Sequence, residues 1–332
     1  MKDNLIVVGG GGGFIGGHLV ADLRRKGFSR IRAVDIKPFD QWYQFFDDVE
    51  NLQLDLQSRE NCDQACADAF EVYNLAADMG GMGFIELNKA ACMLSVLIST
   101  HLLVAAKEQN VKRFFYASSA CVYNAEKQVS EDVVALKEED AYPGMPEDGY
   151  GWEKLFSERM CRHFTEDYGI DTHVARFHNV YGPHGTWDGG REKAPAAVCR
   201  KVIAAKDSGK HEIEIWGSGN QTRSFMFIDD CLNGIDRIMH SEVREPLNLG
   251  SNELVTINQL VDIVEQIAGI KLKRNYNLNA PKGVNGRNSD NTLIKKRLGW
   301  APSIRLYDGM EKTYAWIHDQ FTARTKAKTA HT

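Results

Sequence analysis

Strand-like runs alternate with longer amphipathic stretches along the first half of the chain. Strands are predicted at 5–8, 31–35, 52–56, 71–75, 113–117 and 172–177, and the first of these, LIVV, is continuously apolar, as in strands buried on both faces. Hydrophobic positions with helical spacing are clearest at 86–108 and 151–167. Strands that alternate with helices pair in parallel through right-handed crossovers. The pattern therefore predicts an α/β protein with a doubly wound parallel sheet.

The second half of the chain has a more mixed pattern. Helices are predicted at 194–205, 229–239 and 257–268, and a strand is predicted at 212–216. We expect residues 1–180 to form the sheet domain, with residues 224–247 returning to it. Residues 181–223 and 248–325 are then expected to form a smaller mixed α/β lobe. The polar residues 326–332 are predicted to be a frayed tail.

Composition and charge narrow the functional class. The chain has 332 residues, of which 43% are hydrophobic and 26% are charged, a profile typical of a globular protein. Its net charge of −5 argues against a general nucleic-acid binder. The seven cysteines include no CxxC pair, so the sequence indicates neither a disulfide framework nor a metal site.

Nothing in the sequence predicts attachment to a membrane. The longest uncharged stretch, 90–106, carries two serines, a threonine and a histidine and is shorter than a membrane span, which favours a buried helix. The first residues, MKDN, lead directly into a strand-like run without the pattern of a secretion signal. We therefore expect a cytoplasmic protein with no nucleic-acid or membrane partner.

A glycine-rich turn stands between the first predicted strand and the first predicted helix. Gly10, Gly13 and Gly16 would let the backbone approach a pyrophosphate, which the amino end of the helix attracts. Asp35 follows Gly16 by 19 residues, at the end of the second strand, where a carboxylate accepts hydrogen bonds from the adenosine ribose. Because a carboxylate there repels a 2′-phosphate, NAD is predicted rather than NADP, although Lys37 weakens that preference.

A second motif indicates chemistry at a hydroxyl group. Tyr150 and Lys154 are four residues apart, so they share one face of a predicted helix. A neighbouring ammonium favours the phenolate, which can take a hydroxyl proton while a hydride leaves the same carbon. This spacing is common on its own, and its weight comes from Ser118 and Ser119 at the end of the fifth predicted strand.

The order of serine, tyrosine and lysine after a glycine-rich first turn resembles the short-chain dehydrogenase/reductase superfamily. Further runs resemble its extended branch, the NAD-dependent epimerases and dehydratases: NLAA at 74–77, RxxNxYGP at 176–183, RSF at 223–225 and LGWxP at 298–302. The resemblance covers nearly the whole chain. It implies a Rossmann-type sheet, bound NAD and a nucleotide-sugar substrate.

Four longer runs resemble the members of this branch that act on GDP-mannose. They are DMGGMGF at 78–84, ASSAC at 117–121, GGREKAPAA at 189–197 and GRNSDN at 286–291. The resemblance implies inversion of C3 and C5 of the hexose through a transient 4-keto intermediate. The implied product is GDP-L-galactose, with GDP-L-gulose as a further product when C5 alone is inverted.

Cys121 and Lys193 are the candidate proton-transfer groups. Cys121 lies two residues after Ser119, where the 4,6-dehydratases of this branch have a glutamate. A ketone at C4 acidifies the protons on C3 and C5, and a thiol whose pKa is lowered by a cation is a competent base. Lys193 is the candidate acid on the opposite face, because a cation at a helix start is otherwise mildly unfavourable. A core cysteine and a solvated lysine are the plainer alternatives.

These arguments and the resemblance together predict three groups of site residues. The catalytic group is Ser119, Cys121, Tyr150, Lys154 and Lys193. The cofactor is expected to contact Gly10, Gly13, Phe14, Ile15, Gly16, Asp35, Asp55, Leu56, Leu75, Ala76, Ala77, Tyr150 and Lys154. The substrate is expected to contact Gly80, Gly81, Ser119, Cys121, Asn179, Glu192, Lys193, Ala194, Lys201, Gln221, Arg223 and Arg287, of which the two arginines would grip the pyrophosphate.

Three alternative functions are left open. A 4,6-dehydratase is disfavoured because residues 119–121 read SAC rather than TDE, and a UDP-hexose 4-epimerase would not need Cys121 or Lys193. A non-catalytic NAD-sensing regulator could lose Ser119, Tyr150 or Lys154, yet all three are present. The resemblance also implies a homodimer, with the helices at 90–106 and 153–165 as its interface.

Overall fold

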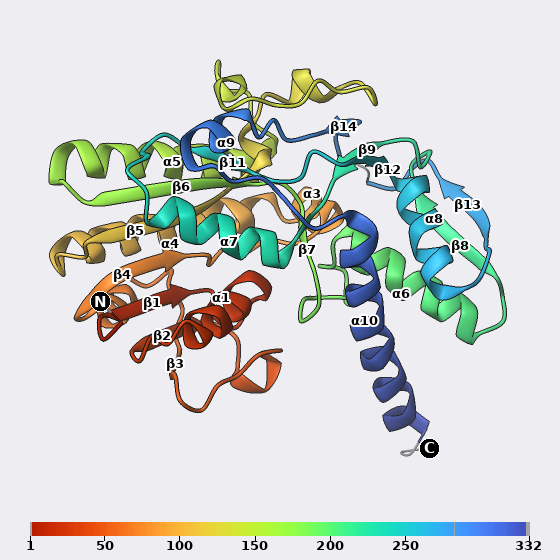
Figure 1. Cartoon of the computed structure of the whole chain (residues 1–332), viewed down its shortest axis with the longest axis horizontal. Coiled ribbons are helices and arrows are strands. Elements are labelled where there is room, and N and C mark those ends of the chain that lie inside the picture. The colour runs from red at the N-terminus through yellow and green to blue at the C-terminus, as the bar shows by residue number, and fades with distance from the viewer. Residues whose placement is uncertain (1, 282, 330–332) are drawn as a thin grey trace.

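A seven-stranded parallel sheet runs through the body of the protein in this computed structural model, which describes residues 2–281 and 283–329 (Figure 1). Its strands are β1 (Leu5–Gly9), β2 (Ile31–Asp35), β3 (Glu50–Gln53), β4 (Ala69–Asn74), β5 (Arg113–Ser119), β6 (Asp171–Phe177) and β11 (Leu247–Leu249). Their spatial order is β11-β6-β5-β4-β1-β2-β3. The strand order reverses at β1 and β4, because β1–β3 extend to one side of the sheet and β4–β6 to the other, so the expected doubly wound sheet is confirmed.

Helices cover both faces of this sheet. Helices α1 (Phe14–Arg25) and α7 (Ile228–Met239) pack together on one face, whereas α2 (Arg59–Cys66), α4 (Lys89–Glu108) and α5 (Asp148–Tyr168) pack on the other. Two separate clusters of buried apolar side chains result, one under each helical layer. The strands are therefore buried on both faces, which is why the apolar runs of β1 and β2 are nearly continuous.

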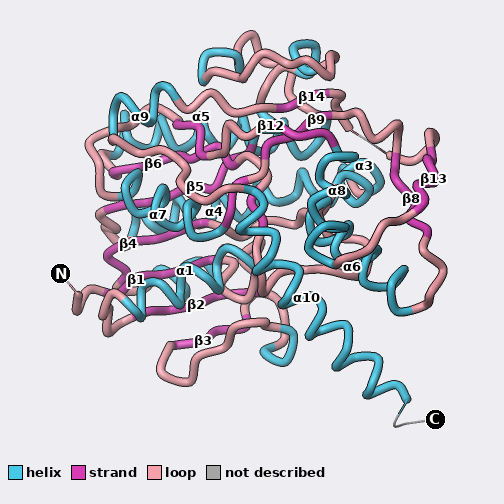
Figure 2. The backbone as a smooth tube through the Cα atoms, turned by 45° about the vertical axis from the view of Figure 1, so that its right-hand side comes forward, coloured by secondary structure: helices cyan, strands magenta, loops and turns pink. Residues whose placement is uncertain are grey.

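A smaller mixed lobe lies beside one end of the sheet (Figures 1 and 2). Its helices are α6 (Ala194–Asp207), α8 (Ile257–Ala268) and α10 (Leu306–Thr329), and its strands are β8 (Glu212–Trp216), β9 (Thr222–Ser224), β12 (Leu254–Thr256), β13 (Lys273–Asn277) and β14 (Gly286–Arg287). The short strands β7 (Val180–Tyr181) and β10 (Met226–Phe227) pair between the lobe and the sheet, and α9 (Thr292–Leu298) packs near β11. The domain boundaries given above stay predictions.

Three predicted elements differ from the structure. The helix expected at 86–108 is divided into α3 (Met82–Leu87) and α4, because the Asn88 side chain donates to the Phe84 carbonyl and competes with the helical pattern. The strand expected at 52–56 ends at Gln53, opposite the last residue of its partner β2. Residues 326–329 of the expected tail continue α10, since alanine and lysine favour helix, while 330–332 lie outside the described residues.

Helix α4 is long and apolar enough to cross a membrane, but its contacts are those of a core helix. It packs against α2 and α5, and Ile98, Leu102 and Leu103 are buried in one of the two cores. Its polar side chains also form hydrogen bonds inside the protein: Ser95 accepts a hydrogen bond from the Asp78 amide and Ser99 accepts one from Asn74. These contacts agree with the buried helix expected for 90–106.

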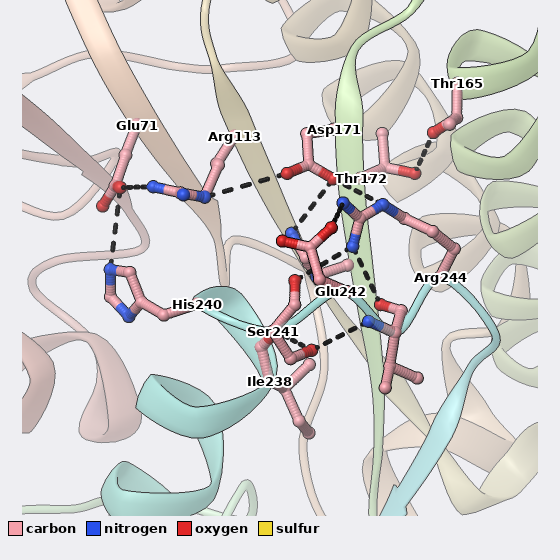
Figure 3. A network of polar contacts seen from close by, with 12 residues as sticks. Glu71, Arg113, Thr165, Asp171, Thr172, Ile238, His240, Ser241, Glu242 and Arg244 are labelled. Atoms are coloured by element: carbon pink, nitrogen blue, oxygen red, sulfur yellow. Dashed lines mark hydrogen bonds and ion pairs between the residues drawn. The ribbon is translucent and has the colours of Figure 1, made fainter. Parts of the chain in front are cut away.

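A network of polar contacts links the amino ends of the central strands of the sheet (Figure 3). Arg113 donates to Glu71 at 3.1 Å and lies 3.7 Å from Asp171, which also accepts from Arg244 at 2.6 Å. His240, at the end of α7, lies 3.6 Å from Glu71 and 3.1 Å from an oxygen of Asp236. The network therefore joins three strands and α7 on the edge opposite the carboxyl ends of the strands.

The charge on His240 is expected to make stability depend on pH. Asp236 and Glu71 raise the pKa of His240 to about 10 from the ordinary 6.5. Because the folded value is the higher one, the stabilisation should be complete below about pH 6.5 and lost as the pH rises towards 10. The free energy of unfolding of His240→Asn should therefore fall furthest below wild type near pH 6, and converge with it near pH 10.

The control is His211→Asn, which replaces an exposed histidine in the turn before β8. Urea unfolding of both variants between pH 6 and pH 10 checks the prediction. A difference from wild type that does not change with pH would mean that His240 is neutral in the folded protein.

Candidate active site

The turn after β1 brings the backbone into very close contact with itself. Gly10 has a φ of +81°, and a Cβ there would lie 2.9 Å from the Ala76 nitrogen. A Cβ on Gly16 would lie 2.0 Å from the Gly10 oxygen, so only glycine lets α1 begin so close to the turn. Gly13 is the residue before α1, and among the described residues no side chain caps that helix. The amino end of α1 is therefore open to an anion.

The other predicted cofactor residues lie along the carboxyl edge of the sheet. Asp35 ends β2 and is buried, and one of its carboxylate oxygens accepts the Lys37 amide at 3.0 Å. The Leu75 amide, just after β4, donates to Gly9 at 3.0 Å. The remaining positions are Phe14 and Ile15 at the start of α1, Asp55 and Leu56 after β3, and Ala76 and Ala77 after β4. The structure thus gathers these predicted positions around the glycine turn.

Ser119, Tyr150 and Lys154 meet where β5 ends and α5 begins. The Ser119 hydroxyl lies near the Tyr150 phenol and acts to lower its pKa. The Lys154 ammonium lies 5.5 Å from the centre of the Tyr150 ring and 4.9 Å from that of Tyr116. Ser118 points elsewhere and donates to Glu158 at 2.5 Å. Of the two serines in the sequence motif, the structure therefore places Ser119 with the tyrosine and lysine.

The electrostatics of this trio differ from the simple expectation of an acidic phenol. Burial and the nearby Cys121 raise the pKa of Tyr150 well above its usual value. The Lys154 ammonium lies 3.5 Å from Glu153, a buried carboxylate that also accepts hydrogen bonds from Tyr116 and Ser157. Part of the lysine charge is therefore balanced by Glu153 rather than directed at the phenol.

Cys121 lies in a buried cluster with Tyr150, two residues beyond the end of β5. Arg287 of β14 donates to the Cys121 sulfur at 3.6 Å, to Glu147 at 2.6 Å and to Gln128 at 2.7 Å. Burial and Glu147 raise the pKa of Cys121 to about 11, while Arg287 opposes them. The guanidinium predicted to grip a pyrophosphate is thus also bonded to the candidate base.

Lys193 is brought to the same place from the small lobe. It precedes α6, and burial lowers the pKa of its ammonium, which lies near enough to Cys121 for the two charges to interact. The loop with Gly80 and Gly81 packs against this segment: the Gly81 amide donates to Arg191 at 3.1 Å, and a Cβ on Gly81 would lie 2.5 Å from the Glu192 oxygen. The two long runs at 78–84 and 189–197 are therefore neighbours in space.

The remaining substrate positions are divided between the site and the small lobe. Arg223 lies within electrostatic range of Cys121 and Arg287, and burial together with Arg287 lowers its pKa to about 10. Glu192 accepts hydrogen bonds from Gly190 and Arg200 before α6, which Ala194 begins. The other three side chains contact neighbouring backbone: Asn179 donates to Ser224, Lys201 to Glu214 and Gln221 to Trp216.

Sequence reasoning missed three buried polar residues of this site. Glu147 and Gln128 hold Arg287, and Glu153 lies beside Lys154. Glu153 directly precedes Lys154 of the tyrosine–lysine motif, so the sequence did contain a signal for it. Glu147 and Gln128 carry no such signal, because their partner comes from a strand 140 and 159 residues away.

The chain can now be placed among known proteins. A model of the NAD dependent epimerase/dehydratase family matches residues 6–250, so the chain belongs to this family. It is 48% identical over 316 residues to GDP-mannose 3,5-epimerase 1 of Oryza sativa subsp. indica, covering 95% of this chain and 82% of that protein. It is 46% identical over 329 residues to GDP-mannose 3,5-epimerase of Arabidopsis thaliana, covering 98% and 85%.

Solved structures of related folds are also similar. A UDP-glucose 4-epimerase of Thermotoga maritima, solved with UDP-glucose, superposes with a TM-score of 0.85 at 24% identity and covers 95% of this chain and 99% of its own. At that identity the likeness concerns the fold alone. It agrees with the Rossmann-type sheet and the adjoining smaller lobe.

NAD is the cofactor of this family, and the residues present fit it. The uncapped amino end of α1 and the glycine contacts leave no room for side chains where a pyrophosphate would lie. Asp35 ends β2, the place from which a carboxylate reaches the adenosine ribose. These residues, with Tyr150 and Lys154 beyond them, would hold the dinucleotide along the carboxyl edge of the sheet.

Removal of the Asp35 carboxylate should change cofactor preference. Asp35→Ala is expected to weaken NAD binding about 10- to 100-fold, the worth of hydrogen bonds to a charged group, and to relax discrimination against NADP. Titration calorimetry with both dinucleotides measures this, with Asp47→Ala, an exposed carboxylate in the same region, as the control. Tighter binding of NADP than of NAD by the wild type would contradict the assignment of Asp35.

Proposed function

We propose that this protein inverts C3 and C5 of the hexose of GDP-mannose through a transient 4-keto intermediate. The observation that carries the proposal is that Lys193, from a distant run, comes within electrostatic range of Cys121, which packs in one buried cluster with Tyr150. Identity of 46–48% over nearly the whole chain to proteins named GDP-mannose 3,5-epimerase supports the choice of substrate. The expected product is GDP-L-galactose, accompanied by GDP-L-gulose when only C5 is inverted.

Tyr150 begins the reaction as a phenolate that accepts the proton of the C4 hydroxyl, and the Ser119 hydroxyl beside it acts to lower the pKa of the phenol. Bound NAD supplies a reversible hydride acceptor for C4, so the overall reaction involves no net redox change. Lys154 places a positive charge beside the tyrosine ring and stabilises the phenolate that is present before the proton is transferred. The buried positions of Tyr150 and Lys154 keep water away from the transient ketone.

Cys121 and Lys193 then exchange protons at the carbons next to the ketone. A proton on C3 or C5 is acidic once C4 is a carbonyl, because the carbanion delocalises as an enolate. Cys121 removes or returns a proton from one face of the ring and Lys193 acts from the other. Burial lowers the pKa of Lys193, which brings its proton exchange closer to neutral pH. A 4-epimerase would not require this second pair of groups.

Incubation of the enzyme with GDP-mannose in deuterated water tests the proposal. Deuterium should appear at C3 and C5 of product and recovered substrate, and nuclear magnetic resonance should identify inverted centres at both carbons. Loss of water without inversion would instead identify a 4,6-dehydratase. Inversion at C4 without deuterium would identify a 4-epimerase. If no reaction occurs, the protein would instead be a binding protein without catalytic activity.

We further propose that the protein is a homodimer joined through α4 and α5. These helices pack side by side, yet Met93, Leu94, Leu97, Trp152 and Phe156 leave 36–51% of their surfaces exposed. Large exposed apolar side chains at helical spacing are the composition of a subunit interface. Light scattering should therefore give twice 37.3 kDa.

Leu94→Glu should produce a monomer, whereas Leu278→Glu, an exposed leucine after β13, should not. A monomeric wild type would contradict the homodimer.

We also propose that the protein resides in the cytoplasm. Its seven cysteines are all free and buried, a usage typical of a reducing compartment. Cell fractionation with an antibody tests this, and recovery in a secreted or membrane fraction would contradict it.

A further inference from the structure

Arg287 joins three side chains that come from separate parts of the chain. Its guanidinium is buried and donates one hydrogen bond each to Gln128, Glu147 and the sulfur of Cys121. The bonds to Gln128 and Glu147 are 2.7 and 2.6 Å, whereas the contact with sulfur is 3.6 Å. The two short bonds therefore fix the guanidinium, and the remaining nitrogen faces the sulfur as a consequence.

Glu147 is held against Cys121 by the backbone as well. Its amide donates to the Cys121 carbonyl at 2.9 Å, and it is the residue before α5. One turn later, a Cβ on Gly151 would lie 2.3 Å from the same carbonyl oxygen, so α5 begins in direct contact with the Cys121 segment. The backbone of Glu147 is thus held beside the Cys121 segment at the start of the helix that carries Tyr150.

We propose that Glu147 is a positioning residue that controls the ionisation of Cys121. Its carboxylate fixes Arg287 so that one nitrogen faces the sulfur, and its negative charge favours the thiol over the thiolate. The step from this ionisation to proton transfer at the sugar rests on the proposed function. The ionisation itself is a property of the protein without substrate.

The charges around Cys121 support this assignment. Charged and titratable groups from the neighbouring elements interact with the sulfur or cluster with it: Glu147 and Tyr150 at the start of α5, Arg287 from β14, Arg223 from β9, Lys193 before α6 and Cys92 from α4. Burial raises the pKa of Cys121 most, the Glu147 carboxylate raises it further, and Arg287 keeps the pKa of Glu147 low despite its burial. Glu147 is therefore charged at the pH at which the enzyme works.

Ultraviolet titration of the thiolate tests the proposal without substrate. The difference in absorbance between a protein with Cys121 and its Cys121→Ser counterpart isolates this one sulfur from the other six. In Glu147→Gln the amide oxygen still accepts from Arg287 but the charge is gone, so the midpoint should fall by about 1–3 pH units. Glu166→Gln, an exposed residue of the same helix, should leave the midpoint unchanged.

A second variant covers the case in which Glu147→Gln does not fold. Arg287→Gln leaves the Glu147 carboxylate beside the sulfur without its cation, so the midpoint should rise above that of the wild type. A purely structural role would lower the melting temperature of either variant and leave the midpoint where it is. An unchanged midpoint in a folded variant overturns the proposal.

Activity separates this inference from the proposed function. The rising limb of deuterium exchange with GDP-mannose should move to lower pH in Glu147→Gln, in step with the titration midpoint. If the wild type does not exchange deuterium but the midpoint still moves, the proposed function fails and the control of Cys121 by Glu147 stands. If the wild type exchanges deuterium and neither quantity moves, Glu147 has no such role.

Discussion

Tyr150→Phe should lose epimerisation and deuterium uptake together. The variant lacks the hydroxyl whose ionised form, the phenolate, accepts the C4 hydroxyl proton, so no ketone forms and the protons on C3 and C5 remain non-acidic. The ring fits the same buried cluster, so the fold should persist. Mass spectrometry of the sugar nucleotide after incubation in deuterated water, with absorbance of the reduced cofactor, measures both losses.

Tyr168→Phe provides the matched control, because this tyrosine is exposed at the far end of the same helix. It should exchange deuterium at the wild-type rate. Deuterium uptake by Tyr150→Phe would mean that proton exchange does not require oxidation at C4, which contradicts the proposed order of events.

Cys121→Ser should give a different result from Tyr150→Phe. A serine hydroxyl is nearly isosteric with the thiol but far less acidic, so it is a poor base. The variant should still oxidise C4, and the reduced cofactor should be visible after addition of GDP-mannose. Inversion and deuterium incorporation should fall by about 10²- to 10⁴-fold, the usual cost of losing a positioned proton-transfer group. Lys193→Ala should resemble Cys121→Ser.

The control for this series is Cys62→Ser, a buried cysteine of α2 whose hydrogen bond to the Leu56 carbonyl a serine can keep. Epimerisation by Cys121→Ser at the wild-type rate would make Cys121 a packing residue. The protein would then be a C4-centred epimerase of another sugar.

The sequence predicted those elements whose signal is local. β1, β2 and α8 lie within a residue or so of their predicted bounds, because their apolar patterns match the burial that each element experiences. The strands of the small lobe were mostly missed. β9, β12 and β14 contain two or three residues each, too few to show a period, and their pairing depends on chain segments far away.

The candidate site likewise contains residues that a local sequence pattern predicts and residues that no local pattern predicts. Ser119 was predictable because it ends a recognisable strand. Tyr150 and Lys154 were predictable because their four-residue spacing places both on one face of a helix. The pairing of Cys121 with Arg287 was not, because 166 residues separate them and no local pattern connects them. In the sequence, Glu147 is indistinguishable from an ordinary acidic residue before a helix. Only its buried contact with Arg287 in the structure distinguishes it.

The long separation of Arg287 from its partners has a consequence for biosynthesis. A nascent chain that has emerged only as far as residue 250 already contains every strand of the main sheet, the glycine turn, Tyr150 and Cys121. Its Glu147 would still be without the arginine that balances its charge in the finished protein. Contacts of such high sequence separation form late in folding. The cofactor platform can therefore form first on the ribosome, and Cys121 and Glu147 meet Arg287 only when translation is nearly complete.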